Sequence, residues 1–299
     1  MTGSTDVILV GLIGAAIQQS KSPALHEAEA RALGLKLSYR LIDLKAPPFD
    51  DRTLSELLVW ALGEGYSGVN VTHPYKQAVI PLLDALSEEA AMIGAVNTVV
   101  FEDGRKIGHN TDEWGFRESF RRQMSDAPLG RVVQIGAGGA GAATAHAMLR
   151  LGADFLSIFD ADTARAKALA DKLATRFGAG RVAAAADLDL VLRDADGLVH
   201  ATPTGMADHP GLPLPAELLR ASLWVAEIVY FPLETALLAL ARELGCRTVD
   251  GGGMVVFQAG RAFELFTGVA PDMERMLALF RARFGCGPFG EARSTPAEG

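Results

Sequence analysis

Cysteine is scarce in this sequence, and its histidines are not spaced as a metal site requires. The chain has two cysteines, Cys246 and Cys286, and no C-x-x-C pair. Its six histidines include no pair four residues apart, the spacing that places two ligands on one helix face. We therefore expect both cysteines to be reduced and structural, and we expect no structural or catalytic metal.

Long apolar runs and blocks of basic charge are also missing. The longest apolar runs, such as residues 237–241, are far shorter than the roughly 20 residues that a membrane-spanning helix needs. The first residues lack the basic start and cleavage pattern of a signal peptide, so the expected location is the cytoplasm. With a formal net charge of -8 and no basic run, the chain also lacks the positive face that nucleic-acid phosphates require.

Length and hydrophobic content favour a soluble enzyme of two domains. The chain has 299 residues, which exceeds the usual size of one compact domain, and 49% of them are hydrophobic. The expected partner is a small-molecule substrate, and monomer and homodimer both remain open.

The central segment, residues 131–141, carries the clearest functional motif. An apolar run breaks into Gly136-Ala137-Gly138-Gly139-Ala140-Gly141, a G-x-G-x-x-G turn, and an alanine-rich helix follows at residues 142–151. Glycines allow the backbone to turn tightly and to approach a pyrophosphate, whose charge is stabilised by the free amides at the helix start. A second apolar run at 155–159 ends in Asp160, roughly 20 residues after the glycines, where a ribose-binding acid is expected. The pattern predicts a dinucleotide-binding Rossmann unit.

Acidic residues after the second strand bear on the choice of cofactor. Asp160 and Asp162 can accept hydrogen bonds from ribose hydroxyls, but they would repel the 2′-phosphate of NADP. Arg165 is close enough in sequence to meet that phosphate, although a solvated position on a helix surface is the simpler explanation. The sequence therefore predicts NAD, and Arg165 leaves NADP open.

Strand-like and helix-like stretches alternate along the rest of the chain. Before the glycine motif we expect strands at 7–13, 37–41 and 68–72, helices at 23–33, 53–62 and 75–83, and a hairpin of 95–101 and 106–108 turning at Asp103-Gly104. After 155–159 we expect a helix at 164–176, buried parallel strands at 198–201 and 224–229, a helix at 235–244, a short strand at 247–250, and helices at 255–266 and 272–284. Between the last strand and these helices, Gly251-Gly252-Gly253 is predicted to be a flexible exit that permits domain closure.

These elements predict an α/β fold of two domains. Residues 1–111 together with 252–288 form an N-terminal α/β substrate domain to which the C-terminal helices return. Residues 112–251 form the Rossmann domain, a cleft separates the two, and residues 289–299 are a disordered tail.

Six short motifs outside the glycine turn follow one another in a fixed order. They are Ser20-Lys21-Ser22-Pro23, Asn70-Val71-Thr72 with Lys76, Gly94-Ala95-Val96-Asn97-Thr98, Asn110-Thr111-Asp112, Ala201-Thr202-Pro203-Thr204-Gly205-Met206, and Gly253-Met254 with Gln258. This set, from about residue 11 to residue 284, closely resembles the shikimate/quinate dehydrogenase family. The resemblance implies reversible hydride transfer between a nicotinamide ring and one ring hydroxyl of a polyhydroxylated cyclohexene or cyclohexane carboxylate.

The resemblance also assigns roles to individual residues. Lys76 is implied to be the proton-transfer residue, because the hydroxyl proton must leave as the hydride leaves, and Asp112 holds both the lysine and the reacting hydroxyl. By themselves, the two residues could be a solvated helix lysine and a helix N-cap. Ser20, Ser22 and Tyr230 are implied to hold the substrate carboxylate, although Ser22 before Pro23 also fits a helix N-cap.

Further residues match positions that read the substrate hydroxyls or contact the cofactor. Thr72, Asn97 and Gln258 match the hydroxyl readers, and each could instead be a satisfied polar group of the core. The cofactor-binding set is Gly136, Ala137, Gly138, Gly139, Ala140, Asp160, Arg165, Thr202, Pro203, Thr204, Met206, Ile228, Gly251 and Met254.

Two departures from the commoner family pattern bear on specificity. Asp160-Ala161-Asp162-Thr163 stands where NADP-using members carry Asn-Arg-Thr, which favours NAD. Glu113-Trp114 follows Asp112 where a glycine is usual, and we expect these side chains to reshape the cleft entrance. The leading hypothesis is an NAD-dependent shikimate dehydrogenase. Quinate or an aminoshikimate-type substrate, another Rossmann dehydrogenase, and a non-catalytic ligand or NAD sensor remain as alternatives.

Overall fold

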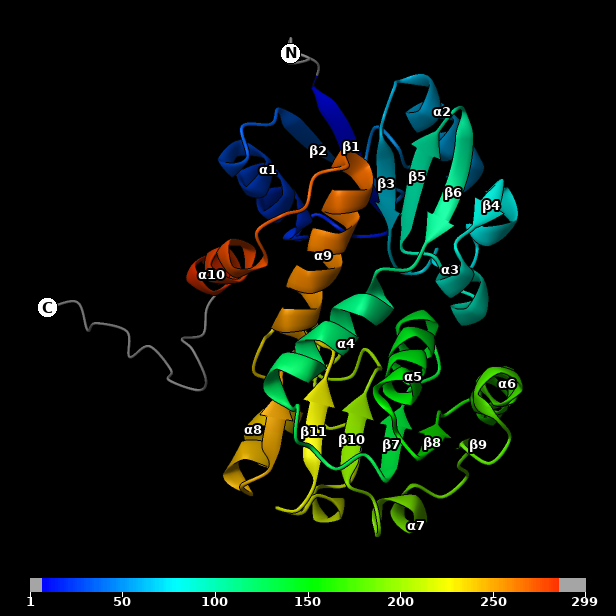
Figure 1. Ribbon diagram of the computed structural model, residues 1–299, viewed down its shortest axis with the longest axis vertical. Helices are drawn as coiled ribbons and strands as arrows, with labels where there is room; N and C mark the ends of the chain where they lie inside the picture. The colour runs from blue at the N-terminus through cyan, green and yellow to red at the C-terminus, as the bar shows by residue number, and fades with distance from the viewer. Residues whose placement is uncertain (1–6, 285–299) are drawn as a thin grey trace, which may run out of the picture.

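Residues 7–284 are described by the computed structural model, and they form two open sheets stacked along the long axis of the molecule (Figure 1). The tail predicted at 289–299 and Cys286 lie outside the described residues. Within residues 7–284, no helix has the length and apolar character that crossing a membrane requires. In the same part of the chain, no group of three or more metal-ligating side chains is placed to hold a metal ion.

The first sheet is mixed and has the order β2-β1-β3-β5-β6-β4. Its strands are β1 (Ile8–Gly14), β2 (Leu37–Asp43), β3 (Gly68–Val71), β4 (Ala85–Leu86), β5 (Thr98–Glu102) and β6 (Arg105–His109). The strands β1, β2 and β3 are parallel, whereas β5 pairs antiparallel with β3 and β6. The predicted hairpin is confirmed, because Asp103 and Gly104 both adopt the positive φ that a tight turn between twisted strands needs.

The second sheet is parallel throughout, as predicted, with the order β12-β11-β10-β7-β8-β9. Its strands are β7 (Arg131–Ile135), β8 (Phe155–Phe159), β9 (Val182–Ala184), β10 (Gly197–His200), β11 (Trp224–Glu227) and β12 (Arg247–Val249). Most of these strands are buried, which explains why they read as continuous apolar runs rather than as alternating patterns.

Helices cover both sheets and connect them. They are α1 (Ser22–Ala32), α2 (Leu54–Gly63), α3 (Glu88–Ile93), α4 (Asp112–Gln123), α5 (Gly139–Leu151), α6 (Thr163–Phe177), α7 (Leu188–Leu192), α8 (Ala236–Glu243), α9 (Gly251–Thr267) and α10 (Met273–Phe284), with short 3-10 helices at Ile80–Leu82 and Ala216–Leu218. Several begin where the sequence offers a cap: Asp162 caps α6, Thr235 caps α8 and Asp250 caps α9.

The C-terminal helices return to the first sheet, as predicted (Figure 1). Phe266 of α9 packs in one cluster with Val10 and Leu12 of β1 and with Tyr39 of β2. Helix α4 lies between the two halves, where Phe116 and Phe120 join the core of the second sheet. This arrangement places the starts of α4, α5 and α9 between the two sheets.

Two local predictions are wrong. Residues 75–83 form turns and the short 3-10 helix Ile80–Leu82 rather than an α-helix, so Lys76 does not lie in the first turn of a helix. The Gly251–Gly253 segment is not a flexible exit, because it is the buried first turn of α9. A Cβ on Gly251 would lie 2.5 Å from the Ile228 carbonyl oxygen, so glycine here permits close packing rather than flexibility.

Candidate active site

Lys76 and Asp112 form a direct ion pair between the two sheets. The Lys76 Nζ lies 2.6 Å from Asp112 Oδ2, and the two side chains are 19% and 4% exposed. Lys76 is held in the turn that follows β3, where its carbonyl oxygen accepts a hydrogen bond from the Val96 amide. Asp112 is the first residue of α4, where the positive end of the helix dipole stabilises a carboxylate. The structure therefore brings together the two predicted catalytic residues.

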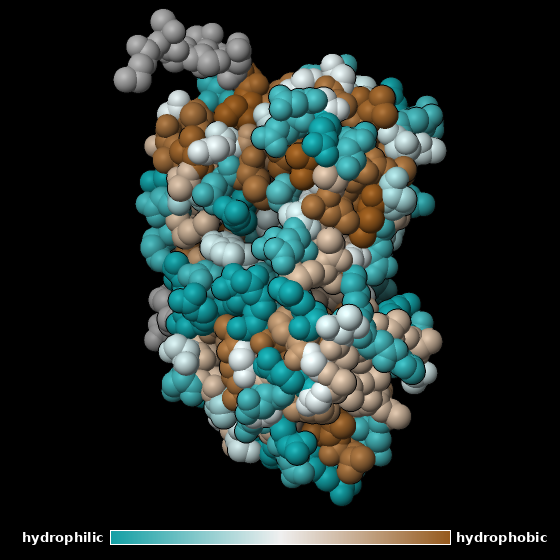
Figure 2. All heavy atoms as spheres, turned by 45° about the vertical axis from the view of Figure 1, so that its right-hand side comes forward, coloured by the Kyte–Doolittle hydropathy of each residue, from teal (hydrophilic) through white to brown (hydrophobic). Residues whose placement is uncertain are grey.

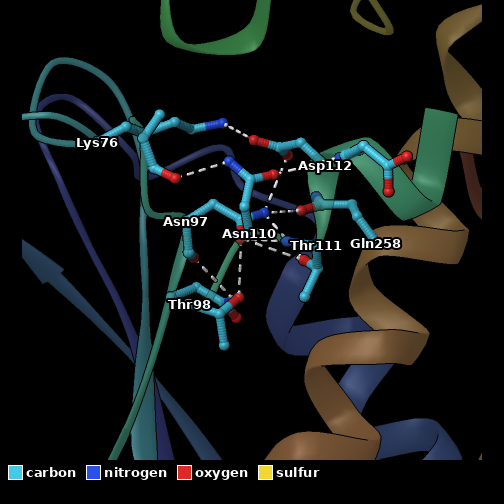
Figure 3. A network of polar contacts seen from close by, with 10 residues as sticks. Lys76, Asn97, Thr98, Asn110, Thr111, Asp112 and Gln258 are labelled. Carbon is cyan, nitrogen blue, oxygen red and sulfur yellow. Dashed lines mark hydrogen bonds and ion pairs between the residues drawn. The ribbon is translucent and has the colours of Figure 1, made fainter. Parts of the chain in front are cut away.

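A buried network of amides and hydroxyls lies behind this pair (Figure 3). The Nδ2 of Asn97 donates to Asp112 Oδ1 at 3.0 Å, to Thr111 Oγ1 at 2.9 Å and to Gln258 Oε1 at 3.0 Å. Its Oδ1 accepts from the Thr111 amide at 2.8 Å. Asn97 is 2% exposed, so in this structure its role is to orient Asp112 and Gln258. Of these three side chains, that of Gln258 is the one that is partly exposed.

The predicted carboxylate-binding residues come from two distant segments. Ser20 and Ser22 lie at the start of α1, where Lys21 rather than Ser22 is the N-cap residue. Tyr230 follows β11 and is 39% exposed. The pKa of the Tyr230 phenol is raised by desolvation and further by the Asp112 carboxylate.

Tyr39 and Lys21 also lie beside these serines. The Tyr39 hydroxyl donates to Asn70 Oδ1 at 2.8 Å, and burial raises its pKa while the Ser22 hydroxyl partly lowers it. The Lys21 Nζ lies 5.3 Å from the centroid of the Phe231 ring and 5.1 Å from that of Phe284. Lys21 is part of the Ser20–Pro23 motif, whereas no sequence pattern pointed to Tyr39.

On the face shown in Figure 2, hydrophilic side chains gather at mid-height on the left and centre, and hydrophobic side chains show in the upper half and in patches below. Thr72, which follows β3, is half-buried beside Gly14.

The glycine motif connects β7 to α5 and faces Lys76. Gly136 has a positive φ, and a Cβ there would lie 2.5 Å from the Ala201 carbonyl oxygen, so only glycine suits this turn. Gly138 is the N-cap residue of α5, and no side chain of the described residues caps this helix, which leaves its first amides free for an anion. A Cβ on Gly139 would lie 3.5 Å from the Lys76 Cβ. These features fit a dinucleotide whose reactive end approaches the catalytic pair.

Asp160 lies at the end of β8, directly beside the glycine motif. Its Oδ2 accepts from the Ala137 amide at 2.8 Å, and its Oδ1 accepts from the Asp162 amide at 2.9 Å. Arg165 on α6 is largely exposed, and its Nη atoms lie 3.9 Å from Asp160 Oδ1 and 3.6 Å from Asp162 Oδ2. The guanidinium is thus turned toward these two carboxylates.

The other predicted cofactor residues lie in two turns and at the starts of two helices. Thr202, Pro203, Thr204 and Met206 follow β10, and Ile228 follows β11, at the C-terminal edge of the sheet where α/β folds bind ligands. Gly251 and Met254 are buried in the first turns of α9. Ala140 is the second residue of α5 and is half-buried.

Glu113 and Trp114 do not reshape the cleft entrance as expected. Glu113 is 2% exposed between α4 and α5, where it accepts from Arg117 Nε at 3.1 Å and lies 3.7 Å from Arg150 Nη1. Trp114 packs edge-on against Phe257 of α9. Successive residues of a helix point about 100° apart, so with Asp112 directed toward Lys76, its two neighbours face other helices.

Comparisons with known proteins show the family of the chain. Residues 12–99 match the family model of the shikimate dehydrogenase substrate binding domain. A protein of Streptomyces avermitilis named shikimate dehydrogenase (NADP(+)) is 60% identical over 275 residues, which cover 91% of this chain and 94% of that protein. The chain belongs to the shikimate/quinate dehydrogenase family. A quinate/shikimate dehydrogenase (NAD(+)) of Corynebacterium efficiens is 49% identical, covering 92% of this dehydrogenase and 98% of that protein.

Solved structures agree on the fold. The structure of a quinate dehydrogenase from Corynebacterium glutamicum in complex with NAD superimposes with a TM-score of 0.87 at 45% identity, covering 93% of this chain and all of that one. The dehydrogenase is therefore an oxidoreductase of the shikimate/quinate type with a Rossmann domain and a nicotinamide dinucleotide cofactor. The names of its relatives divide between NAD and NADP.

Proposed function

We propose that this protein interconverts shikimate and 3-dehydroshikimate with NAD as the preferred cofactor, and that Lys76 transfers the hydroxyl proton. The observation that carries the proposal is the Lys76–Asp112 pair at 2.6 Å, facing the uncapped start of α5. The bound nicotinamide accepts or supplies the hydride. Every other requirement of the reaction falls to side chains of this chain.

The proton is transferred at the Lys76 Nζ. For oxidation, the Lys76 ammonium first releases a proton to solvent; its Nζ then accepts the hydroxyl proton as the substrate hydroxyl becomes a ketone, and it returns that proton in the reverse direction. Asp112 stabilises the ammonium that forms, and the Asn97 hydrogen bond to its other oxygen keeps the carboxylate in place. Ser20, Ser22 and Tyr230 bind the substrate carboxylate, while Thr72 and Gln258 contact its hydroxyls.

The NAD preference rests on charge. Asp160 and Asp162 present two carboxylates beside the glycine motif, where the 2′-phosphate of NADP would be repelled. The guanidinium of Arg165 lies near both carboxylates, which reduces the positive charge that it can offer to a phosphate. The polar residues of the adenine-ribose side therefore favour a ribose with free hydroxyls.

Quinate is the second candidate substrate. The solved structure at 45% identity is that of a quinate dehydrogenase in complex with NAD, and the relative at 49% identity is named quinate/shikimate dehydrogenase. Quinate has an extra hydroxyl on the carbon that carries the carboxylate, and the small side chains of Ser20 and Ser22 do not exclude it.

Initial rates with four combinations test the proposal. Shikimate and quinate are each assayed with NAD and with NADP by nicotinamide absorbance, over a concentration series. The expected result is the highest kcat/KM for shikimate with NAD. A higher kcat/KM for quinate would transfer the proposal to quinate, and a higher value with NADP would contradict the role of Asp160. Absence of turnover with all four combinations, despite NAD binding, would identify a sensor instead of an enzyme.

A further inference from the structure

A fully buried histidine–glutamate pair lies at the C-terminal edge of the second sheet. His200 ends β10 and Glu227 ends β11, and the parallel register places the two residues side by side. The His200 Nδ1 lies 2.9 Å from both carboxylate oxygens of Glu227. Both side chains are 0% exposed. Because ionisable side chains are costly to bury, the position of this pair beside the turns that follow β10 and β11 needs an explanation.

Every polar atom of the pair has a partner. The His200 Nε2 lies 2.6 Å from Thr202 Oγ1, which also accepts from the Thr204 amide at 3.3 Å. Glu227 Oε1 accepts from the Val229 amide at 2.9 Å, and Oε2 accepts from the Thr235 hydroxyl at 3.2 Å. A buried network in which all members are satisfied has one low-energy arrangement, so it fixes the segments that it joins.

These segments are the two turns that border the predicted nicotinamide position. The pair connects the turn after β10, which contains Thr202 and Met206, to the turn after β11, which contains Ile228 and Tyr230. The first turn also touches the glycine motif, since a Cβ on Gly136 would lie 3.0 Å from Thr202 Cγ2. The network therefore joins three segments that meet at the C-terminal edge of the sheet.

The burial of the pair excludes direct contact with the substrate. With side chains that are 0% exposed, neither residue reaches a bound ligand, so neither transfers the proton assigned to Lys76. Any effect of the pair on the reaction passes through the groups bonded to it, which are Thr202, the backbone amide of Val229 and the Thr235 hydroxyl.

We propose that His200, held by Glu227, is a positioning residue that fixes the Thr202–Met206 turn against the nicotinamide half of the cofactor. This inference rests on the proposed function, because it assumes that the nicotinamide lies at this edge of the sheet. The adenine half is bound elsewhere, near Asp160. Loss of the pair should therefore weaken contacts to the nicotinamide half and leave the adenine half unaffected.

The test compares NAD with ADP-ribose, which lacks the nicotinamide. In His200→Phe, the Kd for NAD should rise about tenfold, the loss expected for one hydrogen bond, while the Kd for ADP-ribose stays the same. The kcat should fall about tenfold or more, because a small displacement of a reacting group is costly. The deuterium isotope effect with substrate labelled at the reacting carbon should rise as hydride transfer becomes slower than product release.

Two further variants keep the test decisive. Glu227→Gln preserves the shape of the side chain but removes one acceptor, so it should change the same quantities in the same direction even if His200→Phe fails to fold. Leu156→Ala, in the buried core of β8, is the matched control: it should lower the melting temperature without changing the ratio of the two Kd values.

Three outcomes would overturn either the positioning role of His200 or the proposed function. Equal changes in both Kd values, or a normal kcat in folded His200→Phe and Glu227→Gln, would reduce the pair to a purely structural role. A wild-type protein without turnover would overturn the proposed function, and the comparison of NAD with ADP-ribose would still test the inference by itself.

Discussion

Replacing Lys76 by methionine removes the amine that contacts Asp112 and keeps most of the apolar stem. If Lys76 transfers the proton, the variant should lose activity with shikimate while it still binds NAD and substrate. General acid–base catalysis contributes about 10²–10⁴ in rate, which corresponds to about 3–5 kcal/mol of activation free energy. We therefore expect kcat to fall by that factor, with KM values changed far less.

The same substitution also affects stability, and this effect must be separated from catalysis. The Asp112 side chain is 4% exposed and loses its cationic partner, but Asn97 still donates to it at 3.0 Å. Because the Lys76 side chain is 19% exposed, water can reach the vacated position. We expect the free energy of unfolding to fall by about 2 kcal/mol, within the range for a buried polar group that loses a partner.

The double variant Lys76→Met/Asp112→Asn separates the two effects. Asparagine at position 112 is neutral, so the double variant has no unpaired carboxylate charge in the interior. Much of the unfolding free energy lost in Lys76→Met should therefore return, while kcat stays low. The assays are initial rates by nicotinamide absorbance, urea unfolding, and calorimetric titration of NAD and shikimate. The reasoning is refuted if folded Lys76→Met keeps kcat within about twofold of wild type, since a proton-transfer residue is worth at least about 10².

Three further variants test the predicted cofactor site, the packing behind the Lys76–Asp112 pair, and acid stability. Asp160→Asn keeps an acceptor for the Ala137 amide but removes the charge, so the ratio of kcat/KM for NADP to that for NAD should rise about tenfold; an unchanged ratio would exclude Asp160 as the selector. Gly115→Ala places a Cβ 2.7 Å from the Met254 carbonyl oxygen, which should separate α4 from α9, lower the unfolding free energy by about 1–3 kcal/mol and reduce kcat. Gly63→Ala, whose Cβ would meet no packed atom of the described residues within 4 Å, is the matched control for Gly115→Ala. It should retain the wild-type melting temperature in differential scanning calorimetry and the wild-type kcat. Burial lowers the pKa of His26 from 6.5 to about 3, so the unfolded chain takes up this proton first as the pH falls, and the unfolding free energy should decrease by about 1.4 kcal/mol per pH unit between these values. His26→Leu should reduce that slope in urea unfolding at pH 7 and pH 5, and an unchanged slope would contradict the assignment.

Local sequence patterns determined the secondary structure where the cause was local. The Asp103-Gly104 turn needs positive φ at both residues, and those residue types adopt it readily, so the hairpin could be predicted. The G-x-G-x-x-G turn and the strands of the parallel sheet could also be predicted, because a tight turn requires glycine and a buried strand requires apolar residues. The family motifs then identified the candidate residues, from Ser20 to Gln258.

Tertiary packing overrode local propensity at two positions. Residues 75–83 have helix-like spacing, yet the backbone forms turns so that the Lys76 carbonyl oxygen accepts from Val96 and the side chain reaches Asp112. The three glycines at 251–253 suggested flexibility, but Asp250 caps them as the first turn of a helix that packs against the Ile228 carbonyl. In both cases the deciding contacts come from segments distant in sequence, which no local pattern contains.

The sequence by itself determined the types of element, the dinucleotide motif, the family and the residues to examine. Only the tertiary structure decided which of them meet: Lys76 with Asp112 across 36 positions, Asn97 with Gln258 across 161, and His200 with Glu227 through the register of two parallel strands. The physical reason is that hydrogen bonds and ion pairs need atoms within about 3 Å, and chain separation carries no information about that distance once strands and helices are packed.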